Sequence, residues 1–264
     1  MALSLTPLFS GSSGNAILIS SGTTRILVDA GVSGRRLEEA LRSVDQDARD
    51  LKGILITHEH SDHIQGAGIL SRKHNIPVYA TAPTWEACAD KLGNVQSRLT
   101  RVISKSGFYI DDLFIEPYDI PHDAADPVGY CICAGARKVA VATDLGYFPK
   151  TVEMKLQSCD LVLLESNHDV TMLHTGRYPR ALKERIKSRR GHLSNDDAAD
   201  AAVRLACAGV SSILLGHLSR ENNSEQLAFR TVTDALIAQG LTPGHDLNLG
   251  LAFRDRVTGV FHVK

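Results

Sequence analysis

The 264-residue sequence lacks the long apolar run that a membrane-spanning helix needs, since no stretch approaches about 18 consecutive apolar residues. It also lacks a strong charge of either sign. Its 29 basic and 30 acidic side chains give a formal net charge of -1, so any affinity for a polyanion must come from local clusters. Aromatic residues make up only 5%, which argues against extensive base stacking on a single nucleic-acid strand. The five cysteines are an odd number in a chain too large to need disulfide bonds, which favours reduced thiols in a cytoplasm.

No segment has the composition of a linker or a targeting signal. The first residues, MALSLTPLFSGSSGNA, carry no basic residue ahead of their apolar part, which argues against a secretory signal. The nine prolines are scattered singly, and no stretch rich in Pro, Gly or Ser is long enough to separate domains. We therefore expect residues 1–264 to form a single domain.

Hydrophobic patterns predict short strands interleaved with helices in both halves of the chain. The order of these elements predicts an α/β protein in which two mixed sheets pack face to face, with helices on both outer faces. In the N-terminal half, strands are expected at 3–9, 16–20, 25–29, 53–57, 77–80, in two or three pieces of 101–120, at 129–134 and at 138–143, with helices near 34–44 and 63–73. In the C-terminal half, strands are expected at 161–165 and 212–216, helices at 180–188, 195–208 and 224–239, and a closing hairpin of 247–253 with 257–263.

The most informative segment is HEHSDH at 58–63, which follows an apolar strand and precedes a helix. Three imidazoles and a carboxylate would crowd one another at the end of a buried strand unless they bound a cation. In the turn, His58 and His60 can hold one ion, while Asp62 and His63 are displaced toward the helix and can serve a second. A lone loop histidine is usually only hydrogen-bonded or solvated, but four such groups at this spacing predict a metal site.

Two ions about 3.5–4 Å apart need further ligands, one of them shared. Three other predicted apolar strands end on a residue of ligand type, namely His122, Asp144 and His217. Each of them alone is also what an ordinary polar strand end looks like. Together with segment 58–63, they predict a two-metal site at one edge of the sandwich.

These motifs resemble those of the metallo-β-lactamase-fold hydrolases, whose fold is an αββα sandwich. The resemblance implies that the first metal is held by His58, His60 and His122, the second by Asp62, His63 and His217, and that Asp144 bridges them. Within that superfamily, SGSSGN at 10–15, PHD at 121–123 with GY at 129–130, and LGHLS at 215–219 resemble the YycJ/WalJ group. Members of that group are regarded as DNA exonucleases or phosphodiesterases. The surroundings of His192 also resemble the PhnP phosphodiesterases and RNase Z.

Two departures bear on the substrate. The chain between Asp144 and His217 is too short to contain the large cap domain of the β-CASP nucleases. The sequence also lacks a long glycine-rich arm like the one with which RNase Z clasps tRNA. The first absence argues against the substrates of β-CASP nucleases, and the second argues against tRNA as the substrate.

The expected chemistry is hydrolysis by water activated on two divalent cations, which also neutralise charge on a phosphodiester. Histidine-rich ligation suits Zn²⁺, and the carboxylates also admit Mn²⁺ or iron. Asp62 would be a ligand that orients the nucleophile. His192 matches the position of the general acid in PhnP-like enzymes, with His168 as a rival. The other interpretation of His192 is a histidine hydrogen-bonded to the backbone ahead of a helix.

Substrate contacts are expected from a basic run over 180–190, which ends in Arg190, and from Ser12, Ser13 and Asn15 in the first turn. A solvated helix face and a flexible glycine turn are the alternatives. The favoured hypothesis is a cytoplasmic phosphodiesterase acting on DNA, with no membrane partner. There are two other hypotheses. The protein could be a hydrolase of small esters, thioesters or lactams, or a metal-sensing scaffold without activity. The oligomeric state, monomer or homodimer, is left open.

Overall fold

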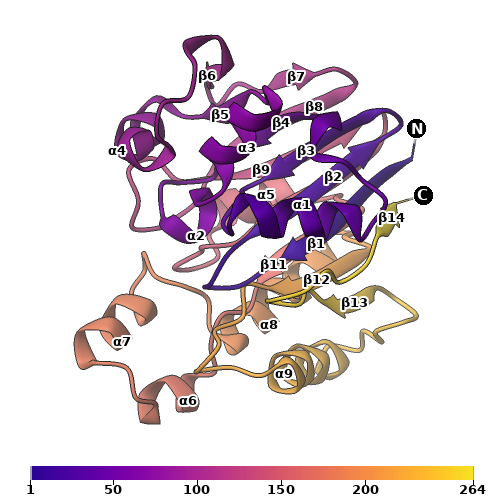
Figure 1. The fold of residues 1–264 in the computed structure, drawn as a ribbon. Coiled ribbons are helices and arrows are strands. Elements are labelled where there is room, and N and C mark those ends of the chain that lie inside the picture. Colours follow the sequence, from indigo (N-terminus) through magenta and orange to yellow (C-terminus); the bar gives the residue numbers. More distant parts are fainter. Residues whose placement is uncertain (1, 264) are drawn as a thin grey trace.

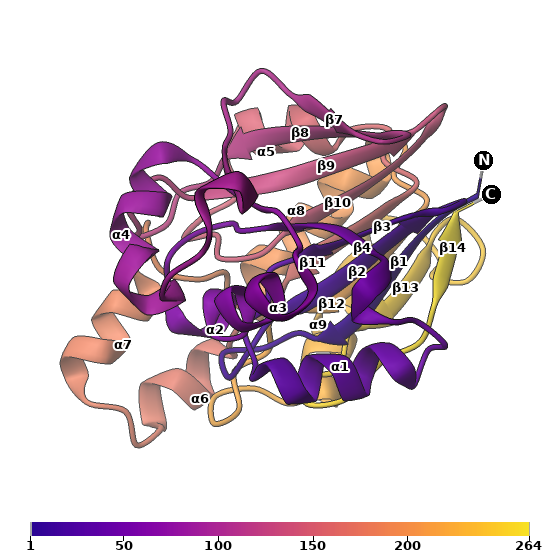
Figure 2. The ribbon, with the colours of Figure 1, turned by 45° about the horizontal axis from the view of Figure 1, so that its top comes forward.

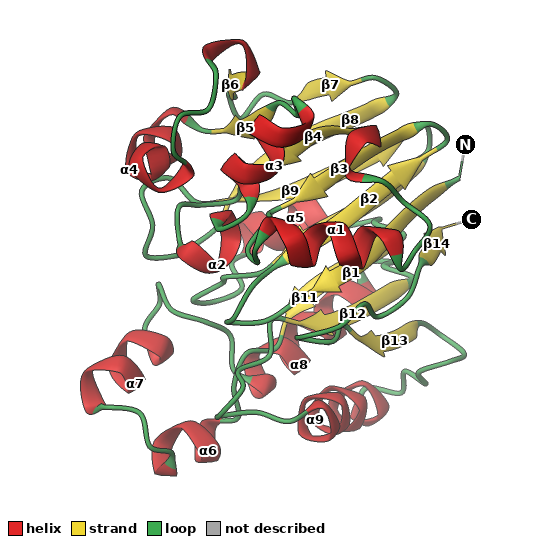
Figure 3. Ribbon diagram, in the orientation of Figure 1, coloured by secondary structure: helices red, strands yellow, loops and turns green. Residues whose placement is uncertain are grey.

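The strands of the computed structural model, which describes residues 2–263, form two seven-stranded sheets (Figures 1 and 3). Both sheets mix parallel and antiparallel pairs, as the sequence predicts. In spatial order, the first sheet consists of β14 (Phe261–Val263), β1 (Leu3–Phe9), β2 (Ala16–Ser21), β3 (Thr24–Val28), β4 (Leu51–Leu55), β5 (Val78–Ala80) and β6 (Thr100–Val102). The second consists of β13 (Asn248–Leu251), β12 (Ser212–Gly216), β11 (Leu161–Glu165), β10 (Arg137–Ala142), β9 (Val128–Ala134), β8 (Leu113–Asp119) and β7 (Phe108–Ile110).

Residues of alternating orientation along each strand fill two different cores. On β11, Leu161 and Leu163 point into the space between the sheets, whereas Val162 and Leu164 face the helices outside. Because successive side chains of a strand point to opposite faces, strands that are apolar throughout require cover on both faces. The result is four layers, helix–sheet–sheet–helix, and the predicted αββα architecture is confirmed (Figure 2).

Helices cover both outer faces of the sandwich. On the first sheet they are α1 (Gly34–Arg42), α2 (Ser61–Ile64), α3 (Ala67–His74) and α4 (Ala82–Leu92). On the second they are α5 (Lys150–Leu156), α8 (Asn195–Cys207) and α9 (Glu225–Ala238). Two further helices, α6 (Val170–Thr175) and α7 (Arg180–Lys187), stand apart from the sheets (Figure 1), and short 3-10 turns occupy Ala48–Asp50 and Ser97–Leu99. None of the helices in residues 2–263 is long and apolar enough to cross a bilayer.

Local signals in the sequence set several helix ends correctly. Ser194 and Asp197 form the predicted capping box of α8, and Ser224 caps α9. The single helix expected over 63–73 is instead two helices, α2 and α3, separated at Gly66. A Cβ at Gly66 would lie 2.4 Å from the carbonyl oxygen of Val32, so the chain turns there in close backbone contact.

The predicted hairpin at the C-terminal end is wrong. Strand β13 pairs in parallel with β12 in the second sheet, whereas β14 pairs antiparallel with β1 in the first, with Leu3 opposite Val263. The two runs follow one another in sequence, but each completes the open edge of a different sheet, where unpaired backbone groups need a partner. This pairing places the ends of residues 2–263 side by side (Figure 1).

Candidate metal centre

The predicted ligands lie on four loops at one edge of the sandwich. Each loop follows a strand. His58, His60, Asp62 and His63 follow β4, His122 follows β8, Asp144 follows β10 and His217 follows β12. A backbone bridge from Gly11 to Leu218 ties the two sheets together at this edge. All seven side chains belong to sets whose potential ligand atoms lie within 4.8 Å of one another.

His58, His60 and His122 bring three ring nitrogens together. Nδ1 of His60 lies 3.0 Å from Nε2 of His58 and 3.3 Å from Nε2 of His122. Ligands of a tetrahedral zinc ion with bonds of about 2.05 Å stand roughly 3.3 Å apart. The spacing of these nitrogens therefore suits a single ion between them.

Asp62, His63 and His217 form a second set. Oδ2 of Asp62 lies 3.5 Å from Nε2 of His63 and 3.9 Å from Nε2 of His217. Asp144 stands between the two sets, because its Oδ2 is 3.4 Å from His63 and its Oδ1 is 3.8 Å from Nε2 of His122. One carboxylate thus faces both histidine groups with different oxygens, which is the position that a shared ligand requires.

Hydrogen bonds donated by Nδ1 orient three of these imidazoles. Nδ1 of His63 donates to Asp29 at 2.8 Å, that of His122 to the carbonyl of Gly191 at 3.1 Å, and that of His217 to Glu165 at 2.8 Å. Donation from Nδ1 leaves Nε2 to face the cluster. Partners of this kind are typical of histidines that bind metals, because they fix the tautomer and the ring orientation.

The backbone is strained where the chain presents these groups. Asp29, Asp144 and His217 adopt left-handed conformations with φ of 61°, 60° and 55°, although none is glycine. Such a conformation costs a non-glycine residue about 1–2 kcal/mol and persists where the surroundings enforce it. All three follow strands directly or within two residues, so the strain lets the chain turn sharply at the strand end while the side chain faces the cluster.

The carboxylates and imidazoles of the cluster shift one another's pKa. Burial alone would raise the pKa of Asp144, but the neighbouring His217 and His63 outweigh it and hold that pKa below its usual value. Burial would likewise lower the pKa of His217, yet Asp144, Asp62 and Glu165 raise it to about 10. The buried carboxylates and the imidazole of His217 thus stabilise one another's charged forms.

Two buried atoms of the cluster also have no hydrogen-bond partner, namely Oδ2 of Asp144 and Nε2 of His217. A buried polar atom without a partner is costly, and both are ligand atoms that point at the cluster. The donor set, its spacing and these two atoms together fit divalent metal ions.

His192 joins the cluster, but His168 does not. Nδ1 of His192 donates to Oε1 of Glu165 at 2.8 Å, and the residue lines the same cavity as Asp62 and Asp144. His168 is buried beside Ser194, and burial lowers its pKa to about 4. It does not line the cavity and is not part of the metal-ligand sets among residues 2–263.

The expected substrate contacts are only partly available. Asn15 is buried, its Nδ2 lies 3.1 Å from Nε2 of His63, and its Oδ1 accepts from the backbone of Gly11. It therefore supports the loop instead of facing solvent. Arg190 is exposed and donates to the carbonyl of His122 at 3.2 Å. Ser12 and Ser13 are exposed and line a cavity beside the cluster.

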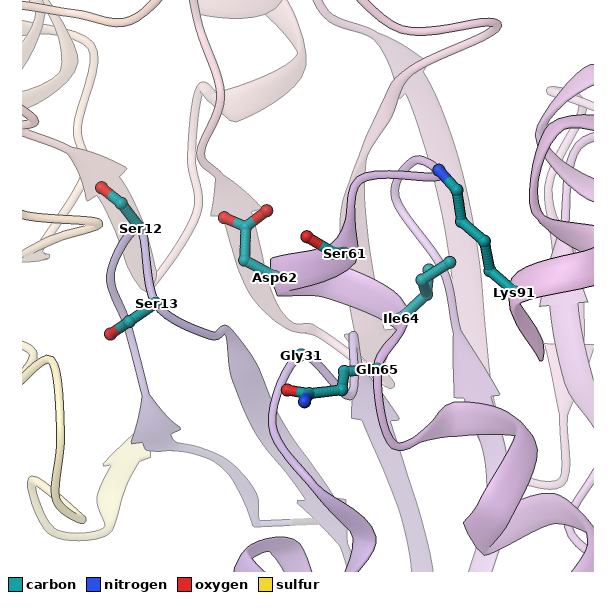
Figure 4. A pocket seen from close by; sticks show the side chains of 8 residues that line it. All are labelled: Ser12, Ser13, Gly31, Ser61, Asp62, Ile64, Gln65 and Lys91. Carbon is teal, nitrogen blue, oxygen red and sulfur yellow. The ribbon is translucent and has the colours of Figure 1, made fainter.

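Two cavities meet at the cluster. One, of about 520 Å³, is lined by Ser12, His60, Ser61, Asp62, Lys91, Asp144, Arg185, His192 and His217. The other, of about 370 Å³, adjoins it and is shown in Figure 4. Lys91 and Arg185 place positive charge at the mouth of the first cavity. Arg185 also forms a two-point ion pair with Asp123, next to His122.

Sequence reasoning missed Glu165, Asp29 and Lys91. Glu165 is fully buried and accepts from Nδ1 of both His192 and His217. Glu165 and Asp29 end or follow apolar strands just as Asp144 does, so the strand-end criterion could have included them. Lys91 is one of several lysines on helix surfaces, and nothing in its sequence context indicates a site.

The fold and the cluster define a β-sandwich hydrolase with a histidine- and carboxylate-rich metal centre. The family described as "Beta-lactamase superfamily domain" matches residues 24–218, and the chain belongs to this family. An exodeoxyribonuclease YycJ of Bacillus anthracis is 38% identical over 245 residues, which cover 92% of this chain and 93% of that protein. The predicted likeness to the YycJ/WalJ group is thereby confirmed.

Solved structures show the same fold. The metallo-beta-lactamase fold protein YhfI from Bacillus subtilis superposes with a TM-score of 0.75 at 18% identity, covering 100% of both chains. A diphosphatase from the PhnP family superposes with a TM-score of 0.67 at 17% identity, covering 100% of this chain and 98% of the other.

Proposed function

We propose that the protein is a metal-dependent phosphodiesterase that cleaves DNA as an exonuclease. The observation that carries the proposal is the buried carboxylate of Asp144, which faces two histidine groups with different oxygens and has an unpartnered Oδ2. The identity of 38% to a protein named exodeoxyribonuclease, across nearly the whole of both chains, supports DNA as the substrate.

The residues present fit two divalent cations. His58, His60 and His122 would hold the first, Asp62, His63 and His217 the second, and Asp144 would bridge them. When bound, such ions supply a water of lowered pKa and neutralise negative charge on a phosphodiester. The prevalence of histidine favours Zn²⁺, while the carboxylates also accommodate Mn²⁺ or iron.

Asp62 is placed to position the attacking water. Its side chain is 25% exposed, whereas those of Asp144 and Glu165 are 3% and 0% exposed, so it is the most accessible carboxylate of the three. One oxygen of Asp62 faces His63 and His217 and leaves the other to accept a hydrogen bond from water. Proton acceptance by a positioned carboxylate contributes directly to hydrolysis.

His192 is placed to protonate the leaving oxygen. Glu165 accepts a hydrogen bond from the Nδ1–H of His192 and fixes the ring, so Nε2 is the nitrogen that can give a proton. As the bond from water oxygen to phosphorus forms, the bond to the leaving oxygen breaks, and that oxygen takes the proton from His192. The oxygens of the scissile phosphate would meet the positive charge of Arg185, which lines the same cavity.

The experiment compares substrates of different classes. The purified chain supplied with Mn²⁺ or Zn²⁺ should hydrolyse bis(p-nitrophenyl) phosphate and degrade duplex DNA from its ends, and should leave the lactam nitrocefin nearly untouched. Release of mononucleotides from linear DNA, together with survival of closed circular DNA, marks an exonuclease. Turnover of nitrocefin or of thioesters without cleavage of phosphodiesters would overturn the proposal and favour the small-molecule hydrolase.

A further inference from the structure

The cavity of Figure 4 is a polar recess beside the metal centre. It is lined by Ser12, Ser13, Gly31, Ser61, Asp62, Ile64, Gln65 and Lys91. Four of these residues, Ser12, Ser61, Asp62 and Lys91, also line the cavity that contains the cluster, so the two spaces adjoin each other. Figure 4 shows Ser12 and Ser13 on one side, Lys91 on the other, and Ser61 and Asp62 between them.

The floor of this recess is fixed before any ligand arrives. The backbone N–H of Asn15 donates to the carbonyl of Asp62, and that of Gly31 donates to the carbonyl of Asn15. A Cβ at Gly31 would lie 1.6 Å from the backbone carbonyl oxygen of Asp62, so only glycine allows the two backbone segments to lie this close. Three segments far apart in sequence are thus locked together beneath the cavity. A preformed site of about 370 Å³ falls in the size range of ligand pockets.

Lys91 supplies positive charge that the protein does not neutralise. Lys73 and Lys155 are paired with glutamates, whereas Lys91 makes its one hydrogen bond within residues 2–263 to the carbonyl oxygen of Glu59, at 3.1 Å. An ammonium with a single neutral acceptor keeps two N–H groups for an incoming anion. Successive phosphates of a nucleic-acid strand lie only one nucleotide apart. When one phosphodiester lies at the metal centre, the neighbouring phosphate is therefore the anion that can reach Lys91.

The rest of the lining suits a sugar and phosphate and not a base. Ser12, Ser13 and Gln65 offer hydroxyl and amide groups, and none of the eight lining residues is aromatic. A site without aromatic rings cannot stack a base, so it recognises the backbone without regard to sequence. Asp62 is the one acid in the lining, and its Oδ2 faces His63 and His217 as part of the proposed metal-ligand set.

We infer that this recess binds the nucleotide next to the scissile bond, with Lys91 contacting its flanking phosphate. The inference rests on the proposed function and adds a subsite to it. Binding at a second phosphate would hold the strand in register, so that the next phosphodiester meets Asp62 and His192. A single charge-assisted hydrogen bond of this kind changes affinity by about tenfold or more.

The first test uses dithymidine substrates that differ by one phosphate. The wild-type protein with Mn²⁺ should hydrolyse either pTpT or TpTp at least about tenfold faster, in kcat/KM, than TpT, which lacks a flanking phosphate. Lys91→Met should reduce this ratio to about one, and Lys91→Arg should retain most of it. Lys52→Met, which changes an exposed lysine on β4, is the control and should keep the full ratio.

The second test measures binding without turnover. Fluorescence anisotropy of a labelled 12-nucleotide single strand in EDTA, over a range of salt concentrations, reports how many phosphates are contacted. Loss of one contact should reduce the slope of log K against log salt by about 0.7 in Lys91→Met and leave it unchanged in Lys52→Met.

The outcomes separate the two proposals. Equal hydrolysis of all three substrates by the wild-type protein, or a phosphate preference that survives in Lys91→Met, overturns the subsite and leaves the proposed function intact. Failure to hydrolyse the three dithymidine substrates, bis(p-nitrophenyl) phosphate and duplex DNA alike, with Mn²⁺ or Zn²⁺, overturns the proposed function, and the subsite with it. If only the dithymidine substrates resist hydrolysis, the salt slope decides the subsite. An unchanged salt slope in Lys91→Met also counts against the subsite.

Discussion

Glu165 provides the sharpest test of how the metal centre is organised. It is fully buried, and each of its oxygens has two donors nearby. Oε1 accepts from Nδ1 of His192 and of His217, both at 2.8 Å, while Oε2 accepts from the backbone N–H of Leu145 at 2.6 Å and of Leu193 at 3.3 Å. Glu165→Gln keeps the shape of the side chain and replaces one acceptor oxygen by an NH₂ donor.

The expected magnitudes follow from this geometry. If the amide oxygen faces the backbone donors, both histidines lose their acceptor, and each hydrogen bond to a charged group is worth about 1.5–3 kcal/mol. Loss of both hydrogen bonds would lower the free energy of unfolding by about 3–6 kcal/mol. Because the removed charge no longer has to be desolvated on folding, we expect a fall of about 3 kcal/mol. His217 can then accept at Nδ1 and carry its proton on Nε2, the atom that faces the metal centre. Zinc affinity should therefore fall by about 10–100-fold.

The assay is competition for Zn²⁺ against a chromophoric chelator, together with urea unfolding followed by circular dichroism. Glu116→Gln is the matched control. It removes a carboxylate whose ion pair with Lys155 is partly exposed, and such pairs contribute only about 0–1 kcal/mol. If Glu165→Gln folds and binds zinc within threefold of the wild-type protein, then Glu165 does not position His217, and the reasoning fails.

Three further predictions concern the same centre. Asp144→Ala should abolish hydrolysis and lower the bound metal from two ions to one or none, as measured by elemental analysis; full activity would refute the bridging role. Dialysis against dipicolinate should remove activity, and added Mn²⁺ or Zn²⁺ should restore it, whereas activity that persists in metal-free protein would refute the metal-dependent mechanism. Gly31→Ala should lower the free energy of unfolding by about 3 kcal/mol or more and weaken metal binding, because its Cβ would collide with the backbone of Asp62; wild-type urea unfolding would show that this contact is not rigid.

The sequence was sufficient for the architecture and for seven of the clustered side chains, but it did not indicate Glu165. The alternating and continuous apolar runs predicted most strands, because burial on both faces leaves a short continuous apolar run in residues such as Leu161 to Leu164. Segment 58–63 concentrates its ligand types locally, so spacing alone indicates a metal site. His122, Asp144 and His217 were found because each stands at the end of an apolar strand, and parallel packing gathers such ends at one edge.

The remaining features depend on contacts that no local pattern records. The open edge of each sheet decides which strand β13 and β14 pair with. The amino-acid patterns of these two strands do not indicate that they belong to different sheets. Likewise α4 carries Lys91 to the cavity only because the helix packs beside the loop of Glu59. An exposed lysine on an amphipathic helix has the same local appearance whether it faces bulk solvent or an active site.

Asp29, Asp144 and Glu165 show where strand-end reasoning stops. All three are carboxylates at or just after the ends of apolar strands, and two of them share the same left-handed backbone. Asp144 reaches histidines of both sets, whereas Asp29 receives Thr57 and Nδ1 of His63, and Glu165 receives backbone N–H groups and two imidazoles. Asp29 and Glu165 accept hydrogen bonds from Nδ1 at 2.8 Å, whereas Asp144 faces Nε2 of His63 and of His122, the nitrogens left to bind a metal. Asp29 and Glu165 meet histidines that follow a neighbouring strand of their own sheet, whereas Asp144 reaches His63 from the opposite sheet, so the distinction emerges only when the tertiary structure brings these partners together.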